Sequence, residues 1–173
     1  GLGLLLMAVW GSAITKLGSH FLGIEYVDHY GTQRFYWFAK HTLLSGTNPS
    51  HTSLLFYPWG KDIYGHTGAN MLDAYLAVPF LLLFGHVAGY NLFVLCGLAL
   101  SGIPFYMLAR EFSEDRYACA TAAFFSAMTP FVLLEVTEGR PTQAILAIPV
   151  LYLVQVFRTG QRRGWKAPVL AGA

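Results

Sequence analysis

Residues 90–109 read YNLFVLCGLALSGIPFYMLA and contain no Asp, Glu, Lys or Arg. A helix of about 20 apolar residues is about 30 Å long, which matches the hydrocarbon core of a bilayer. Residues 117–134 and 141–157 are apolar and uncharged in the same way. These three stretches therefore predict transmembrane helices, and an all-α fold.

The composition of the whole chain agrees with a membrane protein. Of its 173 residues 55% are hydrophobic and 12% are charged, and the mean hydropathy is +0.48. An average soluble domain carries about 25% charged residues. The net charge is +2, and the basic residues form no stripe interleaved with aromatic residues, which excludes nucleic acid as the expected partner.

We expect a single transmembrane domain over residues 1–173. Residues 1–16 predict a first span, 17–88 a long loop, and 167–173 the start of a fifth span, so we expect a piece of a longer protein. The apolar residues 74–88 are ambiguous, because Asp73 precedes them and Pro79 interrupts them. So short a segment suits an interfacial or re-entrant helix better than a full crossing.

The basic residues suggest an orientation. Arg158, Arg162, Arg163 and Lys166 lie within nine residues, and short loops rich in Lys and Arg face the cytoplasm. The turn at 137–141 is then outside, and 110–116 is inside. The count does not decide whether 17–88 is outside, because that depends on whether 74–88 crosses.

The long loop is rich in polar and aromatic residues. Aromatic residues with polar edges settle at the membrane interface, so we expect the loop to lie along the membrane surface. Residues 30–44 predict an amphipathic surface helix, with Phe35, Phe38 and Thr42 on one face and Tyr36, Lys40 and Leu43 on the other. All six histidines fall in the region, but none shows the close spacing of a metal motif: His20, His29, His41, His51, His66 and His86.

Two carboxylates are candidates for chemistry. Asp28 precedes the surface helix, where it can act as a general base or help to hold a divalent cation against a phosphate. The alternative is that Asp28 is the N-cap of that helix, since Asp is a favoured N-cap. Glu138 belongs to a second polar cluster over 135–143, and its alternative role is a solvated turn in which it pairs with Arg140.

The order of these features resembles the amino-terminal part of GT-C type membrane glycosyltransferases, the class of the protein mannosyltransferases and the lipid A aminoarabinose transferase. In that class an acidic residue follows the first span, a helix ends in a Gly-x-x-Pro-like turn, and a juxtamembrane helix precedes the second span. The matching residues here are Asp28, TLLSGTNP at 42–49, FYPWG at 56–60, LFG at 83–85, Tyr90-Asn91, LAR at 108–110, AMTP at 127–130 and Glu138.

The resemblance implies that 74–88 is juxtamembrane and that the first loop is extracytoplasmic, in a bacterial or archaeal cell membrane. It implies transfer of a sugar from a polyprenyl-phosphate carrier, with Asp28 and Glu138 as catalytic residues. The donor phosphate and acceptor would be bound by Arg34, Lys61, Arg140 and His29. The cofactor is left open, with a divalent cation as one option. The chain has Asp28-His29 where many members have paired acids.

A second interpretation makes the chain a non-catalytic membrane subunit of a larger complex, with the aromatic loop as a docking surface. As a piece of a glycosyltransferase the chain is expected to be inactive alone. The expected partners are membrane lipids and a lipid-linked sugar donor, with other membrane subunits in the second interpretation. A transporter is disfavoured, because the three complete spans carry no charged residue in mid-membrane.

Overall fold

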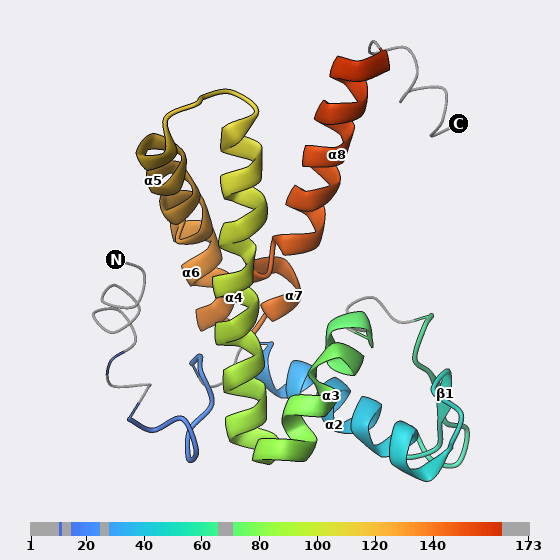
Figure 1. Ribbon diagram of the computed structural model, residues 1–173. Helices are drawn as coiled ribbons and strands as arrows, with labels where there is room; N and C mark the ends of the chain where they lie inside the picture. The colour runs from blue at the N-terminus through green and yellow to red at the C-terminus, as the bar shows by residue number, and fades with distance from the viewer. Residues whose placement is uncertain (1–10, 12–14, 25–27, 66–70, 164–173) are drawn as a thin grey trace.

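The computed structural model describes residues 11, 15–24, 28–65 and 71–163, and it is mostly helical (Figure 1). The predicted first span over 1–16 and the predicted helix start at 167–173 lie outside these residues, apart from positions 11, 15 and 16. The same holds for His66 and Lys166.

Three helical segments are long and apolar enough to cross a membrane: His86–Arg110, Arg116–Thr137 and Pro141–Gly160, with mean hydropathies of 2.0, 1.6 and 1.3. Between 22% and 39% of each is buried inside the protein. Large apolar side chains such as Leu100 and Phe125 are more than half exposed. An apolar outer surface of this kind is stable in lipid, and the expectation of three helical segments long and apolar enough to cross a membrane is confirmed.

Only the first of the three is one continuous helix, α4 (His86–Arg110). The second divides into α5 (Arg116–Ala127) and α6 (Pro130–Thr137), because Thr129 caps α6 through a bond from Val132 N at 3.3 Å and Pro130 occupies its first turn. The third divides into α7 (Pro141–Ala144) and α8 (Ala147–Arg163).

The three segments run in alternating directions, so their connections gather at two ends of the bundle (Figure 1). At one end Arg158 Nε of α8 lies 2.8 Å from Glu111 Oε1, just beyond α4. The turn between α6 and α7 lies at the opposite end, with α2 and α3. The 110–116 connection and the basic segment around Arg158 therefore share one end of the bundle, as the expected topology requires.

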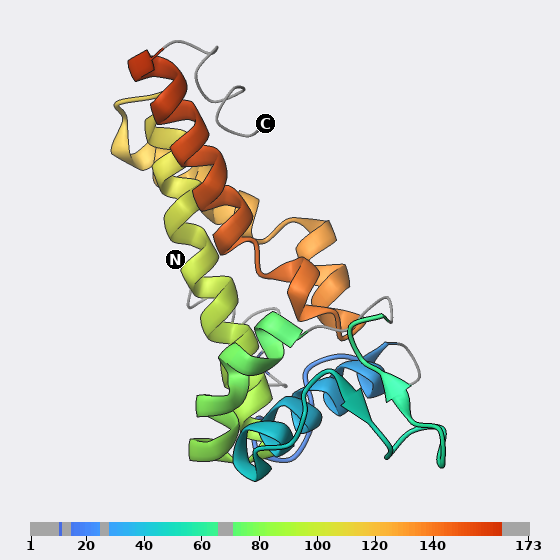
Figure 2. The same ribbon diagram turned by 90° about the vertical axis from the view of Figure 1, so that its right-hand side faces the viewer.

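The long loop contains α2 (His29–Ser45), a two-stranded antiparallel hairpin of β1 (His51–Thr52) and β2 (Lys61–Asp62), and α3 (Met71–Phe84). Figure 2 shows the hairpin beside α2, away from α4. Helix α3 is helical through Pro79 and is 14 residues long. At 1.5 Å per residue it is about 21 Å long, shorter than a ~30 Å hydrocarbon core.

A buried core lies where α2, α3 and α4 pack together. Ala39, Ala74 and Ala77 are fully buried, and such small side chains let helix backbones approach closely. Tyr36 is also fully buried, with its ring 5.3 Å from that of Tyr90. The prediction that Tyr36 lies on the polar face of its helix was therefore wrong, because α3 and α4 cover this side chain.

Candidate functional site

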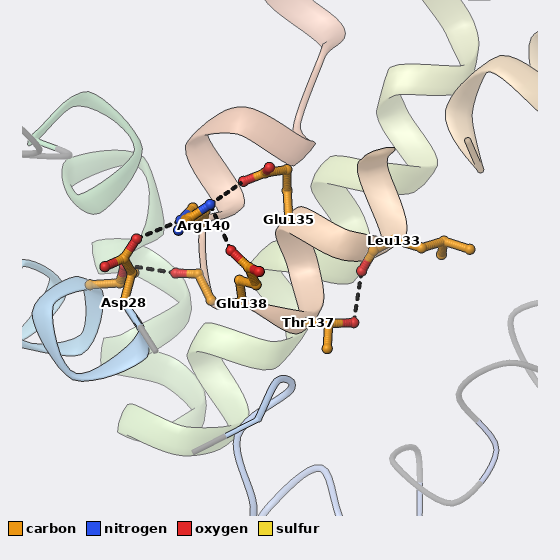
Figure 3. Close-up of polar contacts among 8 residues, drawn as sticks. Asp28, Leu133, Glu135, Thr137, Glu138 and Arg140 are labelled. Atoms are coloured by element: carbon orange, nitrogen blue, oxygen red, sulfur yellow. Dashed lines mark hydrogen bonds and ion pairs between the residues drawn. The ribbon is translucent and has the colours of Figure 1, made fainter. Parts of the chain in front are cut away.

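Three carboxylates surround the guanidinium of Arg140, the residue just before α7 (Figure 3). Arg140 Nε lies 2.5 Å from Asp28 Oδ2, and Nη1 lies 2.6 Å from Glu138 Oε2 and 3.6 Å from Glu135 Oε2. The hydrogen bond to Asp28 is the main reason that the pKa of Arg140 is raised. With three acids against one base, the Arg140 cluster carries excess negative charge.

The cluster forms because two segments far apart in the sequence are bonded together. Ile24 N donates to Thr137 O at 2.8 Å, and Thr32 Oγ1 donates to Gly139 O at 2.7 Å. Gly139 has φ +75°, and a Cβ there would lie 2.8 Å from the Cα of His29. The turn can approach α2 this closely because position 139 is glycine.

The side chain of Asp28 does not cap α2. Asp28 precedes the helix with φ −66° and ψ −3°, and its side chain accepts no capping bond from the helix. The N-cap alternative for this carboxylate was therefore wrong. The side chain is 63% exposed, so one oxygen of the carboxylate binds Arg140 while the rest of the group lies at the protein surface.

The predicted turn contact between Glu138 and Arg140 is present, but it is part of the larger cluster. The Glu138 side chain is 25% exposed and that of Glu135 is 6% exposed. Glu135 Oε2 has no hydrogen-bond partner among the described residues. A carboxylate this buried depends on the nearby guanidinium, because an unpaired buried charge is costly.

A second polar network is bonded to the first turn of α7. Asp73 of α3 is 8% exposed, and its Oδ2 accepts from Tyr36 Oη at 2.8 Å and from Thr142 Oγ1 at 2.7 Å. Burial raises the pKa of Asp73, and the bonds from Thr142 and Tyr36 act in the opposite direction. Burial and the charge of Asp73 raise the pKa of the Tyr36 phenol, so it stays protonated and donates.

This network connects the core to the Arg140 cluster. Thr142 is in the first turn of α7, two residues after Arg140. Asp73 therefore fixes α7 against α2 and α3, and through α7 it fixes the position of the Arg140 backbone. Asp73 Oδ1 is buried without a hydrogen-bond partner among the described residues, as is Gln33 Oε1.

Three other predicted site residues lie outside the cluster. His29 is buried, its Nε2 is 2.8 Å from Leu22 O, and its ring is 5.5 Å from that of Tyr90. A carbonyl can only accept, so Nε2 carries the proton. The guanidinium of Arg34 lies 5.0 Å from the ring centre of Phe35, and Lys61 Nζ lies 5.3 Å from that of Phe56.

The described carboxylates and histidines form no preassembled site of three or more metal ligands. No group of three or more His, Cys, Asp or Glu side chains in this part of the chain is arranged to hold a metal ion. In the Arg140 cluster the guanidinium lies between the carboxylates, where a cation would have to sit. The chemistry of the cluster is therefore best derived from its own side chains.

Tyr36, Asp73 and Thr142 could not be predicted from the sequence as a connected set. One signal was available: Asp73 is the only charged residue in the apolar stretch MLDAYLAVPFLLLF at 71–84. A carboxylate in the first turn of a helix is usually explained by its favourable interaction with the helix dipole. That explanation gives no reason to expect the carboxylate to be buried and to accept hydrogen bonds from other segments. Nothing in the sequence indicates that Tyr36 and Thr142 donate to it.

No protein-family model, curated protein or solved structure matches this chain.

Proposed function

We propose that the chain is the amino-terminal part of a GT-C type membrane glycosyltransferase that transfers a sugar from a polyprenyl-phosphate carrier to an acceptor at the extracytoplasmic face. The observation that carries the proposal is the position of Asp28. Its carboxylate is fixed by Arg140, is not used as a helix cap, and is largely exposed at the end of the bundle that holds α2 and α3.

In the transfer the acceptor hydroxyl attacks the anomeric carbon of the sugar, the bond from that carbon to the phosphate oxygen breaks, and the polyprenyl phosphate leaves with its electron pair. A base must take the proton of the acceptor hydroxyl as the new glycosidic bond forms. Asp28 can do this, because Arg140 fixes the orientation of one carboxylate oxygen and leaves the other available. A general base must come within about 2.6–3.2 Å of the hydroxyl, and a side chain that is 63% exposed can be reached. Glu138, on the same guanidinium, is positioned beside it.

The arrangement of the loop supports the same class. Helix α2 directly follows Asp28, ends at Gly46 with φ +65°, and is followed by Pro49, which is the helix-and-turn order of the resemblance. Helix α3 is too short to cross and leads directly into α4. We assign this end of the bundle to the extracytoplasmic side of a bacterial or archaeal cell membrane, with the basic end around Arg158 in the cytoplasm.

The test is Asp28→Asn in the full-length protein. Asn keeps the size of the side chain and a hydrogen-bond acceptor for Arg140 but is not a base. Transfer from polyprenyl-phosphate sugars should fall roughly 10²- to 10⁴-fold, the usual contribution of a general base. The matched control is Asp62→Asn, because Asp62 is an exposed carboxylate of the same loop that bonds Tyr64 N at 2.9 Å, away from Arg140.

Size-exclusion elution and thermal unfolding should be the same for the wild type, Asp28→Asn and Asp62→Asn. If Asp28→Asn transferred sugar at the wild-type rate, Asp28 would not be the general base. If the wild type transferred no sugar from any polyprenyl-phosphate donor, the enzyme proposal would fail.

The second candidate is a non-catalytic membrane subunit, and one observation favours it. Phe56, Tyr57 and Trp59 are 70%, 81% and 84% exposed on the hairpin connection, and aromatic residues are enriched in protein interfaces. This candidate predicts that Asp28→Asn changes nothing and that Trp59→Ser releases the chain from a membrane complex. The enzyme proposal predicts the reverse for Asp28→Asn.

A further inference from the structure

A groove between α4 and α5 is open on the outer surface of the bundle. Helix α5 lies beside the second half of α4 (Figure 1), and the space between them has a volume of about 640 Å³ and apolar walls. Small residues line it, among them Ala99, Gly102, Ala120 and Ala123. A Cβ at Gly102 would meet no atom of the described residues within 4 Å. Small residues on membrane helices let another helix approach closely, so the groove has the shape to receive a helix.

The chain that precedes the long loop is fixed at the start of α4. The side chain of Asn91 is fully buried, and its Nδ2 donates to Leu17 O at 2.8 Å. Its Oδ1 accepts from Leu22 N at 2.8 Å. Just before this point Thr15 N donates to Gly11 O at 3.4 Å, which is the bond pattern of an α-helical turn. The predicted first span therefore ends beside Asn91.

One face of α4 leads from Asn91 to the groove. Five residues share this face, because they are spaced three or four positions apart: Asn91, Leu95, Ala99, Gly102 and Tyr106. A helix that ends beside Asn91 and lies along this face meets the groove about 12 Å away, the rise of eight residues. The groove is therefore within reach of a span of ordinary length.

The residue types of the predicted span match the groove level by level. The span and α4 would run in opposite directions with the same rise per residue. A residue some number of positions before Leu17 is then level with the residue the same number of positions after Asn91. Three pairs are level by this count: Val9 with Ala99, Leu6 with Gly102, and Leu2 with Tyr106. The three span residues are spaced four and three apart, so they share one helix face. Large apolar side chains would thus meet the small residues of the groove.

A segment of the same chain also has an advantage over a separate partner. A second molecule loses translational and rotational freedom when it binds. The first ten residues are already held beside this face of α4 through the bonds at Asn91, which gives them a high effective concentration at the groove.

We propose that residues 1–10, which lie outside the described part of the chain, dock as a transmembrane helix in the groove between α4 and α5. Their leucine and valine face lies against the small residues of α4. This packing does not depend on whether the protein is an enzyme. It gives the loop that contains Asp28 a fixed starting point on the bundle.

The test is disulfide cross-linking of the full-length protein in native membranes, after both natural cysteines have been removed. Leu6→Cys paired with Gly102→Cys, and Val9→Cys paired with Ala99→Cys, should each form a bond within one chain under mild oxidation. The control is Leu6→Cys paired with Tyr152→Cys, because Tyr152 is 69% exposed on α8, on the other side of α4 from α5 (Figure 1). The control pair should react roughly tenfold more slowly or less.

A second measurement fills the groove. Gly102→Leu should slow the cross-link between Val9→Cys and Ala99→Cys roughly tenfold or more, because the added side chain occupies space that the span needs. The matched control is Leu100→Phe, which enlarges an exposed side chain about 200° around the same helix. It should leave the rate of cross-linking unchanged.

Other occupants of the groove give different results. Dimers linked through Gly102→Cys, in place of the bond to Leu6→Cys, would show that a second copy fills the groove and would overturn the proposal. No bond in either pair, or bonds that form as fast in the control pair, would also overturn it and would leave the groove to lipid or to another helix. Cross-linking that is unchanged by Gly102→Leu would show that the span lies elsewhere.

Discussion

The network around Asp73 should behave as a coupled, pH-sensitive unit, and a double-mutant cycle can measure this. Tyr36→Phe and Thr142→Val each remove one donor to Asp73 Oδ2 while conserving side-chain volume. A hydrogen bond to a charged group is worth about 1.5–3 kcal/mol. Each single variant should therefore lose about that much unfolding free energy at pH 7.

In the double variant the buried carboxylate of Asp73 has neither donor, so its negative charge is poorly compensated. The carboxylate can avoid the free-energy cost of this buried charge by binding a proton. Protonation at pH 7 limits the electrostatic cost to about 4 kcal/mol, since one pKa unit is 1.36 kcal/mol and an ordinary aspartate has a pKa of about 3.9. Because burial already raises the pKa of Asp73 in the wild type, part of this limit is already used. Two losses in the upper half of the range of about 1.5–3 kcal/mol exceed what remains. The double variant should thus cost less than the sum of the single variants.

The sign of the pH dependence follows from the raised pKa of Asp73. The folded protein binds a proton at Asp73 more tightly than the unfolded chain does. The stability that follows from this is fully present below about pH 3.9, the ordinary pKa of aspartate, and is lost as pH rises through the raised pKa of Asp73. Removing the two donors raises the pKa further. At pH 5 protonation of Asp73 limits the cost of its buried charge to about 1.5 kcal/mol. The double variant should therefore lose clearly less unfolding free energy at pH 5 than at pH 7.

The measurement is unfolding of the purified protein in mixed micelles with increasing dodecyl sulfate, followed by circular dichroism at pH 5 and pH 7. The matched controls are Tyr152→Phe and Thr121→Val, whose side chains are exposed on α8 and α5. The reasoning is refuted if the single variants lose less than about 0.5 kcal/mol, or if the double variant is additive and equally destabilised at both pH values.

Two further predictions test the docking of α2 and the topology. Gly139→Ala should destabilise the protein by roughly 1–3 kcal/mol, because position 139 has φ +75° and its Cβ would meet the backbone of His29; Gly31→Ala, in open space on α2, is the control and should lose nothing. In a protein without Cys96 and Cys119, cysteines at Ser53 and His86 should react with an impermeant label from one side of the membrane, and a cysteine at Ser113 from the other. Labelling of all three from the same side would contradict the three crossings.

The sequence could predict the membrane helices because their signal is local. A run such as 90–109 is apolar over the thickness of a bilayer, and this property does not depend on what the helix packs against. The breaks inside the spans were less visible. Thr129-Pro130 is a cap-and-proline pair that starts a new helix, but within an apolar stretch a proline is usually interpreted as a kink.

The sequence could nominate Asp28, Glu138 and Arg140 separately, but it could not place them together. Asp28 and Arg140 are 112 positions apart, and their contact depends on backbone bonds from Ile24 and Thr32 to the 137–139 turn. Bonds of this kind have no sequence pattern. A capping role for Asp28 also fitted its position, since Asp is a favoured N-cap wherever it precedes a helix.

The arrangement also explains why one short helix can matter to the whole site. Helix α7 has Arg140 immediately before it and Thr142 in its first turn, so the carboxylate cluster and the buried Asp73 network hold it from two sides. A helix of four residues has almost no stability of its own. Its position must come from these side-chain contacts, and a change at Asp73 should therefore move Arg140 without touching it. In the proposed enzyme, the base Asp28 is oriented by Arg140, and Arg140 is in turn oriented by the interior of the protein.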